Sequence, residues 1–193
     1  TAPDPSLPRA AALIVAAGRG TRMGGELPKQ YQVLGGEAVL TRTIRAFSEH
    51  PGIEAVVIVR HADDSDLCRA ALPRTGTPLI EVIGGATRGA SVKAGLAAVP
   101  EGVAQVLIHD GARPLVSAAT ISDVLAALRA SPGAAPGLEV TDALWRGDAH
   151  VTGFAPRDGL YRAQTPQGFD LAAIRAAYEV HDGPAADDVE VAR

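Results

Sequence analysis

The sequence predicts an α/β fold in which a mainly parallel, twisted sheet carries helices on both faces. Short apolar runs rich in β-branched residues alternate along the chain with segments whose apolar residues recur at helical spacing. Such alternation is typical of crossover connections, which place strands side by side in parallel and cover both faces of the sheet with helices. The expected architecture is therefore Rossmann-like, and in such sheets ligands bind beyond the carboxyl ends of the strands.

Four strands and the helices between them follow from these patterns. The strands are expected at residues 12–16, 53–59, 79–83 and 105–108, and the helices at 39–49, 63–72, 87–99 and 121–128, around 171–178 and from 187 onward. Loops at residues 16–29, 84–88 and 109–114 follow three of these strands. They are the candidates for ligand binding.

A linker rich in alanine, proline and glycine at residues 131–137 ends this regular alternation. The next segment, about 138–156, predicts two short strands around a polar turn, with few apolar residues to bury. We interpret it as a β-arm that protrudes from a single domain spanning residues 1–193. Because Leu144 and Trp145 are exposed on such an arm, it predicts a homodimer formed through the arm.

Composition and charge exclude several classes of partner. The chain has 193 residues and a formal net charge of -4, with no broad basic field, so we expect neither nucleic acid nor a membrane as partner. No apolar stretch approaches the roughly 20 residues that a membrane helix needs. Acidic Asp4 precedes the apolar run at 10–18, which favours a buried first strand over an export signal. We expect a cytoplasmic protein.

The cysteine and histidine residues predict no structural metal site. Cys68, the one cysteine, lies in a predicted amphipathic helix, where we expect a buried apolar thiol and not a nucleophile. The five histidines are scattered without the spacing of metal ligands, and we expect His109 to be packed inside the fold.

The loop at residues 16–29 predicts a binding site for a polyphosphate. Its small residues allow the backbone to approach an anion, and two arginines and a lysine add positive charge. Two commoner glycine motifs are excluded. A dinucleotide fingerprint would need glycine at Met23, and a P-loop would need lysine and a hydroxyl residue where Glu26 and Leu27 stand.

Five motifs follow one another along the chain. They are Leu13 to Gly24, Pro28 to Tyr31, Gly84 to Ser91 with Arg88, His109 to Pro114, and Arg157 to Leu160 followed by Ala163 to Gln167. Together they resemble those of the 2-C-methyl-D-erythritol 4-phosphate cytidylyltransferase family, within the sugar nucleotidyltransferases. The resemblance covers nearly the whole chain, and it implies transfer of CMP from CTP to 2-C-methyl-D-erythritol 4-phosphate in non-mevalonate isoprenoid synthesis. The products it implies are 4-diphosphocytidyl-2-C-methyl-D-erythritol and pyrophosphate.

The resemblance also implies roles for individual residues. As catalytic groups it implies Arg22 and Lys29, which stabilise the transition state on the triphosphate, and Arg157, which reaches the acceptor across the dimer. For CTP it implies Ala16, Ala17, Gly18, Gly20, Arg22, Lys29, Gly84, Gly85, Ser91 and Asp110, and for the acceptor Asp110, Arg113, Arg157, Thr165 and Asp188. The implied cofactor is Mg²⁺, held by the triphosphate and by Asp110.

This chemistry needs no general base. The attacking phosphate has a second pKa of about 6 and is already largely ionised at neutral pH. Positioning of the reactants and stabilisation of charge on the phosphorus are sufficient for catalysis. The absence of a Ser-His-Asp or Cys-His arrangement from the sequence is consistent with this mechanism.

Three departures from the family pattern bear on the prediction. Ala86 stands where an acidic residue commonly reads the cytosine amino group, and Ala143 stands where a threonine often touches the acceptor. Relatives continue through a strand carrying a lysine that contacts both substrates. We therefore expect that the sequence up to Arg193 is part of a longer chain, which in some relatives includes a fused cyclodiphosphate synthase domain.

Two alternatives stay open on the sequence alone. A ribitol 5-phosphate cytidylyltransferase shares the Pro-Lys-Gln element at 28–30 and the Asp-x-x-Arg-Pro element at 110–114. An inactive nucleotide-binding module is suggested by the absent lysine and by Ala86.

Overall fold

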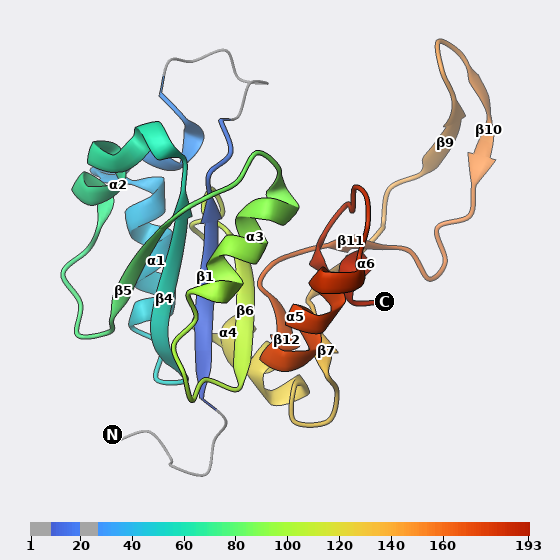
Figure 1. The fold of residues 1–193 in the computed structure, drawn as a ribbon. Coiled ribbons are helices and arrows are strands. Elements are labelled where there is room, and N and C mark those ends of the chain that lie inside the picture. The colour runs from blue at the N-terminus through green and yellow to red at the C-terminus, as the bar shows by residue number, and fades with distance from the viewer. Residues whose placement is uncertain (1–8, 20–26) are drawn as a thin grey trace.

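A six-stranded, mainly parallel sheet forms the centre of the molecule (Figure 1). The computed structural model describes residues 9–19 and 27–193. Across the sheet the strands lie in the order β5-β4-β1-β6-β12-β7. The strands are β1 (Ala10–Ala16), β4 (Ile53–Arg60), β5 (Leu79–Ile83), β6 (Gln105–Asp110), β7 (Gly133–Ala134) and β12 (Gln167–Asp170). The predicted α/β fold is confirmed, and the four predicted strands are all present.

The central strand β1 is covered on both of its faces. Its even-numbered residues, such as Ile14, pack in one apolar cluster, and its odd-numbered residues, such as Leu13, pack in a second. Side chains alternate between the two faces of a strand, so burial of both faces requires a continuous apolar run. This explains why the sequence of β1 is apolar throughout instead of alternating with polar residues.

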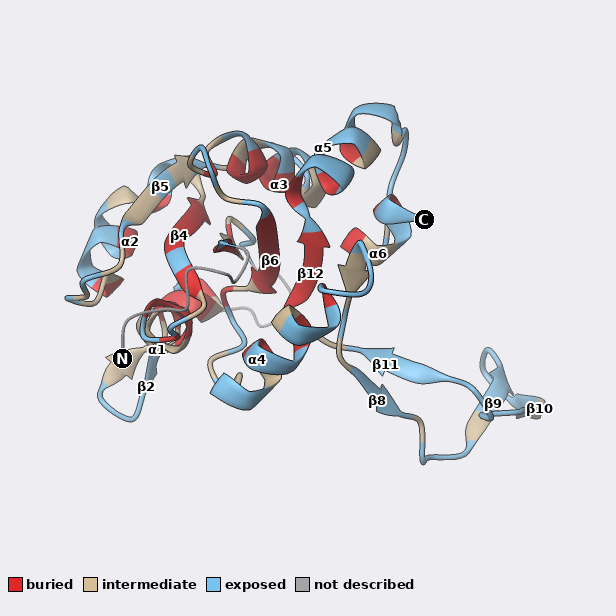
Figure 2. Ribbon diagram, turned by 90° about the horizontal axis from the view of Figure 1, so that it is seen from below, coloured by how far each residue is buried: buried red, intermediate tan, exposed pale blue. Residues whose placement is uncertain are grey.

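Helices form the two outer layers (Figure 2). Apolar residues of α1, α2 and α4 pack on one face of the sheet, and those of α3, α5 and α6 pack on the other. No helix in the described part of the chain has the length and apolar content to cross a membrane. The helices are α1 (Val39–Ser48), α2 (Ser65–Ala71), α3 (Arg88–Ala97), α4 (Ala118–Ala127), α5 (Leu171–Val180) and α6 (Asp188–Ala192), with short 3-10 helices η2 (Lys29–Tyr31) and η3 (Ala62–Asp64).

Cys68 is buried within α2, as the helical pattern predicted. Burial raises the pKa of its thiol to about 12, with the nearby Glu81 carboxylate as the next cause. Because the thiolate is the nucleophilic form, this cysteine acts as a packed apolar group.

The part of the sheet after β6 departs from the parallel pattern. β12 runs antiparallel to β6, and β7 runs antiparallel to β12. Neither strand was predicted from the sequence, because β12 contains only Phe169 as a large apolar residue and β7 is only two residues long. A further short hairpin, β2 (Val33–Leu34) with β3 (Glu37–Ala38), was also not predicted.

A β-arm extends away from the sheet, and it is longer than predicted (Figure 1). It contains two separate antiparallel pairs instead of one hairpin over 138–156. At its tip β9 (Leu144–Gly147) pairs with β10 (Val151–Ala155), and nearer the sheet β8 (Gly137–Glu139) pairs with β11 (Tyr161–Ala163).

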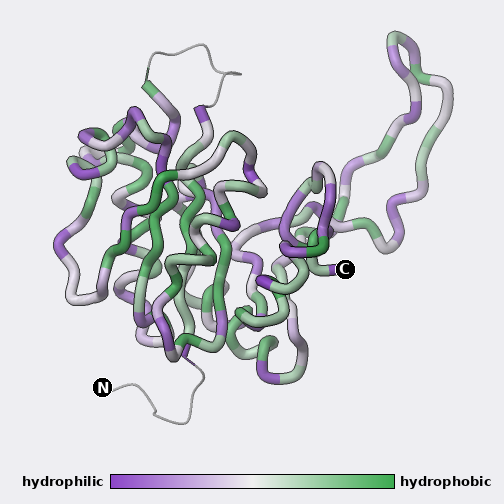
Figure 3. The backbone as a smooth tube through the Cα atoms, in the orientation of Figure 1, coloured by the Kyte–Doolittle hydropathy of each residue, from purple (hydrophilic) through white to green (hydrophobic). Residues whose placement is uncertain are grey.

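Several large apolar side chains on the arm are exposed, as predicted for Trp145, whereas Leu144 is half-buried and not exposed as expected. Trp145 is 66%, Phe154 75% and Tyr161 65% accessible to solvent. By contrast, the hydrophobic positions of the domain gather in the strands of the sheet (Figure 3). Exposed apolar surface of this kind is typical of protein contacts, so dimerisation through the arm stays a prediction.

Candidate active site

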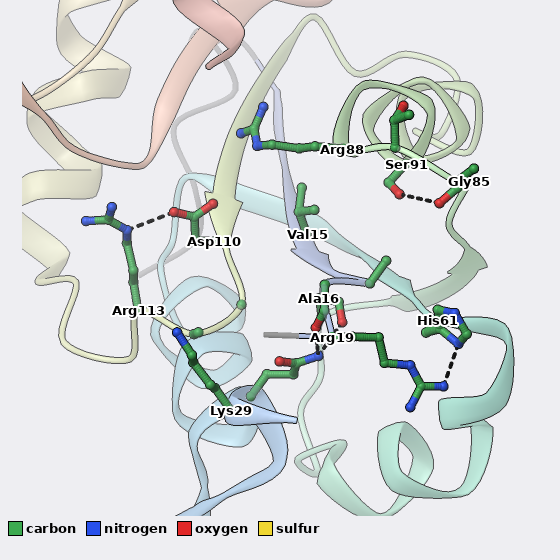
Figure 4. A pocket seen from close by; sticks show the side chains of 17 residues that line it. Val15, Ala16, Arg19, Lys29, His61, Gly85, Arg88, Ser91, Asp110 and Arg113 are labelled. Atoms are coloured by element: carbon green, nitrogen blue, oxygen red, sulfur yellow. Dashed lines mark hydrogen bonds and ion pairs between the residues drawn. The ribbon is translucent and has the colours of Figure 1, made fainter. Parts of the chain in front are cut away.

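A pocket of about 810 Å³ lies at the carboxyl ends of β1 and β6 (Figure 4). This is the edge at which ligands bind to open α/β sheets, and the volume is sufficient for a nucleotide. Its lining comes from all three loops selected from the sequence, together with His61 after β4. The lining residues are Val15, Ala16, Ala17, Gly18, Arg19, Lys29, Gln30, His61, Gly85, Ala86, Thr87, Arg88, Ser91, Asp110, Gly111, Ala112 and Arg113.

The turn after β1 is held in shape by Gln30. The Nε2 amide of Gln30 donates hydrogen bonds to the carbonyl oxygens of Ala16, at 2.6 Å, and Gly18, at 3.0 Å. The side chain is buried, so these bonds satisfy polar groups that would otherwise be costly to bury. They join η2 to the end of β1 and thereby place Lys29 at the pocket.

The opposite wall is built where the backbone after β5 approaches the end of β1. A Cβ atom added to Gly84 would lie 2.7 Å from the Cβ atom of Ala17 and 2.7 Å from the Oγ atom of Ser91. Ser91 donates a hydrogen bond to the carbonyl oxygen of Gly85 at 3.3 Å. The Thr87 side chain accepts from the Ala90 amide and so caps the amino end of α3.

This close approach predicts that Gly84→Ala damages the pocket. The added methyl group must push Ala17 and Ser91 apart, and we expect KM for the nucleotide to rise by about 10-fold, corresponding to roughly 1.4 kcal/mol of binding free energy. Steady-state kinetics measure this effect. Gly76→Ala is the control, because nothing lies within 4 Å of an added Cβ there and Gly76 belongs neither to the pocket nor to the arm; an equal effect of both substitutions would contradict the prediction.

The loop after β6 brings the carboxylate of Asp110 and the guanidinium of Arg113 together as an ion pair. The Nε atom of Arg113 donates to the Oδ2 atom of Asp110 at 2.8 Å, and its Nη1 atom donates to Gln164 at 3.0 Å. Behind this pair His109 is packed against Phe47, with ring centroids 4.9 Å apart. Burial lowers the pKa of His109, although its hydrogen bond to the backbone of Arg113 acts in the opposite direction. The ring is therefore neutral.

Arg88 is held at the pocket by a carboxylate from α6. Its guanidinium donates two hydrogen bonds to Asp188, at 2.9 Å to Oδ1 and 2.6 Å to Oδ2. The hydroxyl of Tyr178 donates a third, at 2.6 Å to Oδ1. Burial raises the pKa of Tyr178, and the charge of Asp188 raises it further, so the hydroxyl keeps its proton.

Asp188 is predicted to contact the acceptor. Its carboxylate is completely buried, and Asp188 is not among the residues that line the pocket. Its oxygens accept from Arg88 and Tyr178. In this structure Asp188 therefore contributes to the pocket by holding Arg88, and its contact with the acceptor stays a prediction.

The other predicted site residues fall into three groups. Thr165 is hydrogen-bonded to His109 and is not among the residues that line this pocket, and Arg157 lies on the arm, where it donates to the carbonyl oxygen of Thr141. Gly20 and Arg22 lie outside the described residues. Those that the structure brings together at the pocket are Ala16, Ala17, Gly18, Lys29, Gly85, Ser91, Asp110 and Arg113, with Gly84 directly behind Ala17 and Ser91.

Several lining residues were not among the site residues assigned individually from the sequence, although Arg19 was one of the two arginines expected to add positive charge. Arg19 donates to Asp63 at 2.9 Å and contacts the Nδ1 atom of His61 at 2.8 Å, which ties the first loop to η3. Arg88 and Gln30 lie inside motifs that were recognised, so their position in the sequence could have indicated that they belong to the site. His61 has no such signal, since no motif surrounds it.

The charges of the pocket favour an anionic ligand. The cationic side chains of its lining are Arg19, Lys29, Arg88 and Arg113, and Asp110 is the only carboxylate among the lining residues that the structure describes. Arg19, Arg88 and Arg113 each also pair with a carboxylate, from Asp63, Asp188 and Asp110 in turn. The guanidinium and ammonium groups at the pocket still supply several N–H donors that suit phosphate oxygens.

Comparison with known proteins identifies the family. The family model described as 2-C-methyl-D-erythritol 4-phosphate cytidylyltransferase matches residues 10–193. The chain belongs to this family. It is therefore a cytidylyltransferase, and the resemblance inferred from its five motifs is confirmed.

Curated relatives of the cytidylyltransferase are similar over almost all of its length. The 2-C-methyl-D-erythritol 4-phosphate cytidylyltransferase of Cereibacter sphaeroides is 53% identical, covering 95% of this chain and 82% of that protein. The bifunctional enzyme IspD/IspF of Ruegeria pomeroyi is 57% identical, covering 95% of this chain and 48% of that protein. The chain thus spans about half the length of such bifunctional relatives.

Solved structures of family members share the fold. The 4-diphosphocytidyl-2C-methyl-D-erythritol synthase of Anaerococcus prevotii matches with a TM-score of 0.82 and 30% identity, over 95% of this chain and 81% of that one. The 2-C-methyl-D-erythritol 4-phosphate cytidylyltransferase of Thermus thermophilus matches with a TM-score of 0.77 and 33% identity, over 95% and 83% of the two chains.

Proposed function

We propose that this cytidylyltransferase transfers CMP from CTP to 2-C-methyl-D-erythritol 4-phosphate and releases pyrophosphate. The observation that carries the proposal is the pocket itself, in which Lys29, the turn at 16–18 and the pair Asp110 and Arg113 meet at one edge of the sheet. Family membership supplies the reaction class.

In the proposed complex, CTP lies between the two walls of the pocket. The cytidine packs against the backbone of residues 16–18 on one side and of 84–85, with Ser91, on the other. The small side chains there leave room for the base and ribose. The triphosphate lies at Lys29, which neutralises part of its charge, and Arg22, outside the described residues, is the second cation proposed for it.

Transfer is an in-line displacement at the α-phosphorus. A phosphate oxygen of the acceptor forms a bond to this phosphorus while the bond to the bridging oxygen breaks, and the β- and γ-phosphates leave together as pyrophosphate. Lys29 stabilises the negative charge that accumulates on the phosphorus and on the leaving group. Because the acceptor phosphate is already ionised, no side chain removes a proton.

The acceptor occupies the side of the pocket bounded by Asp110 and Arg113. Arg113 offers guanidinium donors to the acceptor phosphate, a geometry for which arginine is well suited. Thr165 and Arg157 complete this subsite in the proposal, with Arg157 supplied by the arm of a second copy. A monomer in light scattering would contradict that contribution in trans.

Magnesium fits the donors present if the substrate supplies most of its ligands. No group of three or more His, Cys, Asp or Glu side chains among the described residues is placed to hold a metal ion. Mg²⁺ is commonly bound by one or two carboxylates together with phosphate oxygens. Asp110 is the residue that would contribute, and the ion would neutralise charge on the triphosphate.

The acceptor assay tests the proposal directly. Purified full-length protein with CTP and Mg²⁺ is expected to release pyrophosphate with 2-C-methyl-D-erythritol 4-phosphate and not with ribitol 5-phosphate. The opposite preference would favour the ribitol phosphate alternative, and no release with either acceptor would favour an inactive nucleotide-binding module. Replacing CTP by UTP in the same assay measures base selectivity in the presence of Ala86.

A further inference from the structure

His109 makes hydrogen bonds through both of its ring nitrogens to two parts of the proposed acceptor site. It lies in β6 and is 1% exposed to solvent. Its Nε2 atom is 2.9 Å from the backbone carbonyl oxygen of Arg113, and its Nδ1 atom is 2.9 Å from the Oγ1 atom of Thr165. The imidazole thus connects the loop after β6 with the segment that leads into β12.

The chemistry of these partners fixes the tautomer. A carbonyl oxygen can only accept, so Nε2 carries the proton and donates to Arg113. In the neutral ring Nδ1 is then an acceptor, and the Thr165 hydroxyl donates to it. A buried Nδ1 without this partner would be costly, so the hydroxyl proton of Thr165 is committed to the ring.

The two hydrogen bonds of His109 determine whether Thr165 and Arg113 offer a ligand donors or acceptors. With its proton committed, the Thr165 hydroxyl offers lone pairs, which suit a hydroxyl group of the acceptor better than its phosphate. Arg113 is fixed at its backbone by His109, while its guanidinium is directed by Asp110 and Gln164. It offers donors, which suit the phosphate.

The imidazole is itself held in place. Phe47 packs on it at 4.9 Å with the rings inclined by 57°. Both hydrogen-bonding partners and this ring contact are on separate elements, so the imidazole has little freedom to reorient.

We infer that His109 is a positioning residue of the acceptor site: it fixes Arg113 and Thr165 relative to each other, so that one binds the acceptor phosphate and the other a hydroxyl of the same molecule. The inference rests on the proposed function. It adds a residue that touches neither substrate and that determines affinity for the acceptor and not for CTP.

Two substitutions separate the two hydrogen bonds. In His109→Gln the side-chain amide can still donate to the Arg113 carbonyl but offers no acceptor at the place of Nδ1. In His109→Asn the amide oxygen can still accept from Thr165 but does not reach Arg113. We expect each variant to raise KM for 2-C-methyl-D-erythritol 4-phosphate by roughly 3-fold to 10-fold, the value of one hydrogen bond, with KM for CTP within about 2-fold of wild type.

His50→Gln is the matched control. His50 is also largely buried, and both of its ring nitrogens have hydrogen-bonding partners, Ser122 and the Gly52 amide. It lies just before the amino end of β4, whereas the pocket lies at the carboxyl ends of the parallel strands. We expect this control to leave KM for both substrates unchanged. Equal changes in the control and in the His109 variants, or a rise in both KM values for the His109 variants, would show a general structural role and overturn the inference.

A binding measurement makes the test independent of turnover. Calorimetric titration of 2-C-methyl-D-erythritol 4-phosphate, in the presence of a saturating non-hydrolysable CTP analogue, is expected to show the same 3-fold to 10-fold weakening in both variants. If the wild-type protein binds the acceptor but does not convert it, the proposed function is contradicted. The comparison of acceptor affinity between wild type and variants still tests the role of His109 in that case. Unchanged affinity in both variants, or no binding to wild type, would overturn the inference.

Discussion

Replacing Lys29 by alanine is expected to lower kcat by roughly 100-fold to 1,000-fold. The side chain lines the pocket next to the turn after β1, where the triphosphate lies in the proposed complex. Removing one preorganised donor from a site that stabilises transition-state charge typically has an effect of this size. Single-turnover kinetics with saturating CTP measure it without interference from weaker binding.

The chain's other lysine provides the control. Lys93 lies in α3, is exposed and does not line the pocket. Lys93→Ala is expected to leave kcat unchanged. Thermal unfolding should be close to wild type for both variants, since neither side chain belongs to the core. Wild-type turnover in Lys29→Ala would show that the triphosphate does not lie on this loop.

Replacing Asp188 by alanine is expected to lower the free energy of unfolding by about 3 kcal/mol. Removing one partner of a buried ion pair typically costs about 3–5 kcal/mol, because the remaining charge is left without compensation. We expect the lower end because the side chain of Arg88 is 34% exposed and gains partial hydration from the pocket. Urea unfolding followed by circular dichroism measures the change.

Activity should fall in the same variant, since Arg88 loses the carboxylate that directs it. Asp66→Ala is the matched control, because Asp66 pairs with Arg69 on the surface, where both side chains are largely exposed. Exposed pairs contribute little to stability. An equal, small effect of both substitutions would mean that Asp188 is not a structural anchor.

Most of the sheet was predictable from the sequence. Parallel strands buried on both faces require continuous apolar runs, and such runs stand out at β1 and β4. β12 does not stand out in this way, because it begins with Gln167 and Gly168 and so has no continuous apolar run. The Gln167 side chain is nevertheless buried, since its Oε1 atom accepts from the Asp188 amide and its Nε2 atom donates to Asp187. Such burial depends on partners that lie twenty residues away and leaves no local pattern.

The same distinction, between local sequence patterns and contacts distant in sequence, applies to the candidate site. Residues in glycine-rich or polar loops after strands, such as Lys29 and Asp110, were found because the topology brings the ends of parallel strands together. The roles of His109 and Asp188 were not found from the sequence. Each acts through a hydrogen-bonded partner distant in sequence, Thr165 in one case and Arg88 in the other. Periodicity and loop composition contain no information about such pairs.

The pairing of Arg88 with Asp188 also bears on how the enzyme is made. The two residues are 100 positions apart, and the ribosome delivers Arg88 first. Until α6 emerges, a nascent chain has the central strands of the sheet but no carboxylate to direct this arginine. The part of the pocket formed by Arg88 is therefore completed late in synthesis, only after nearly all of the described chain has been translated.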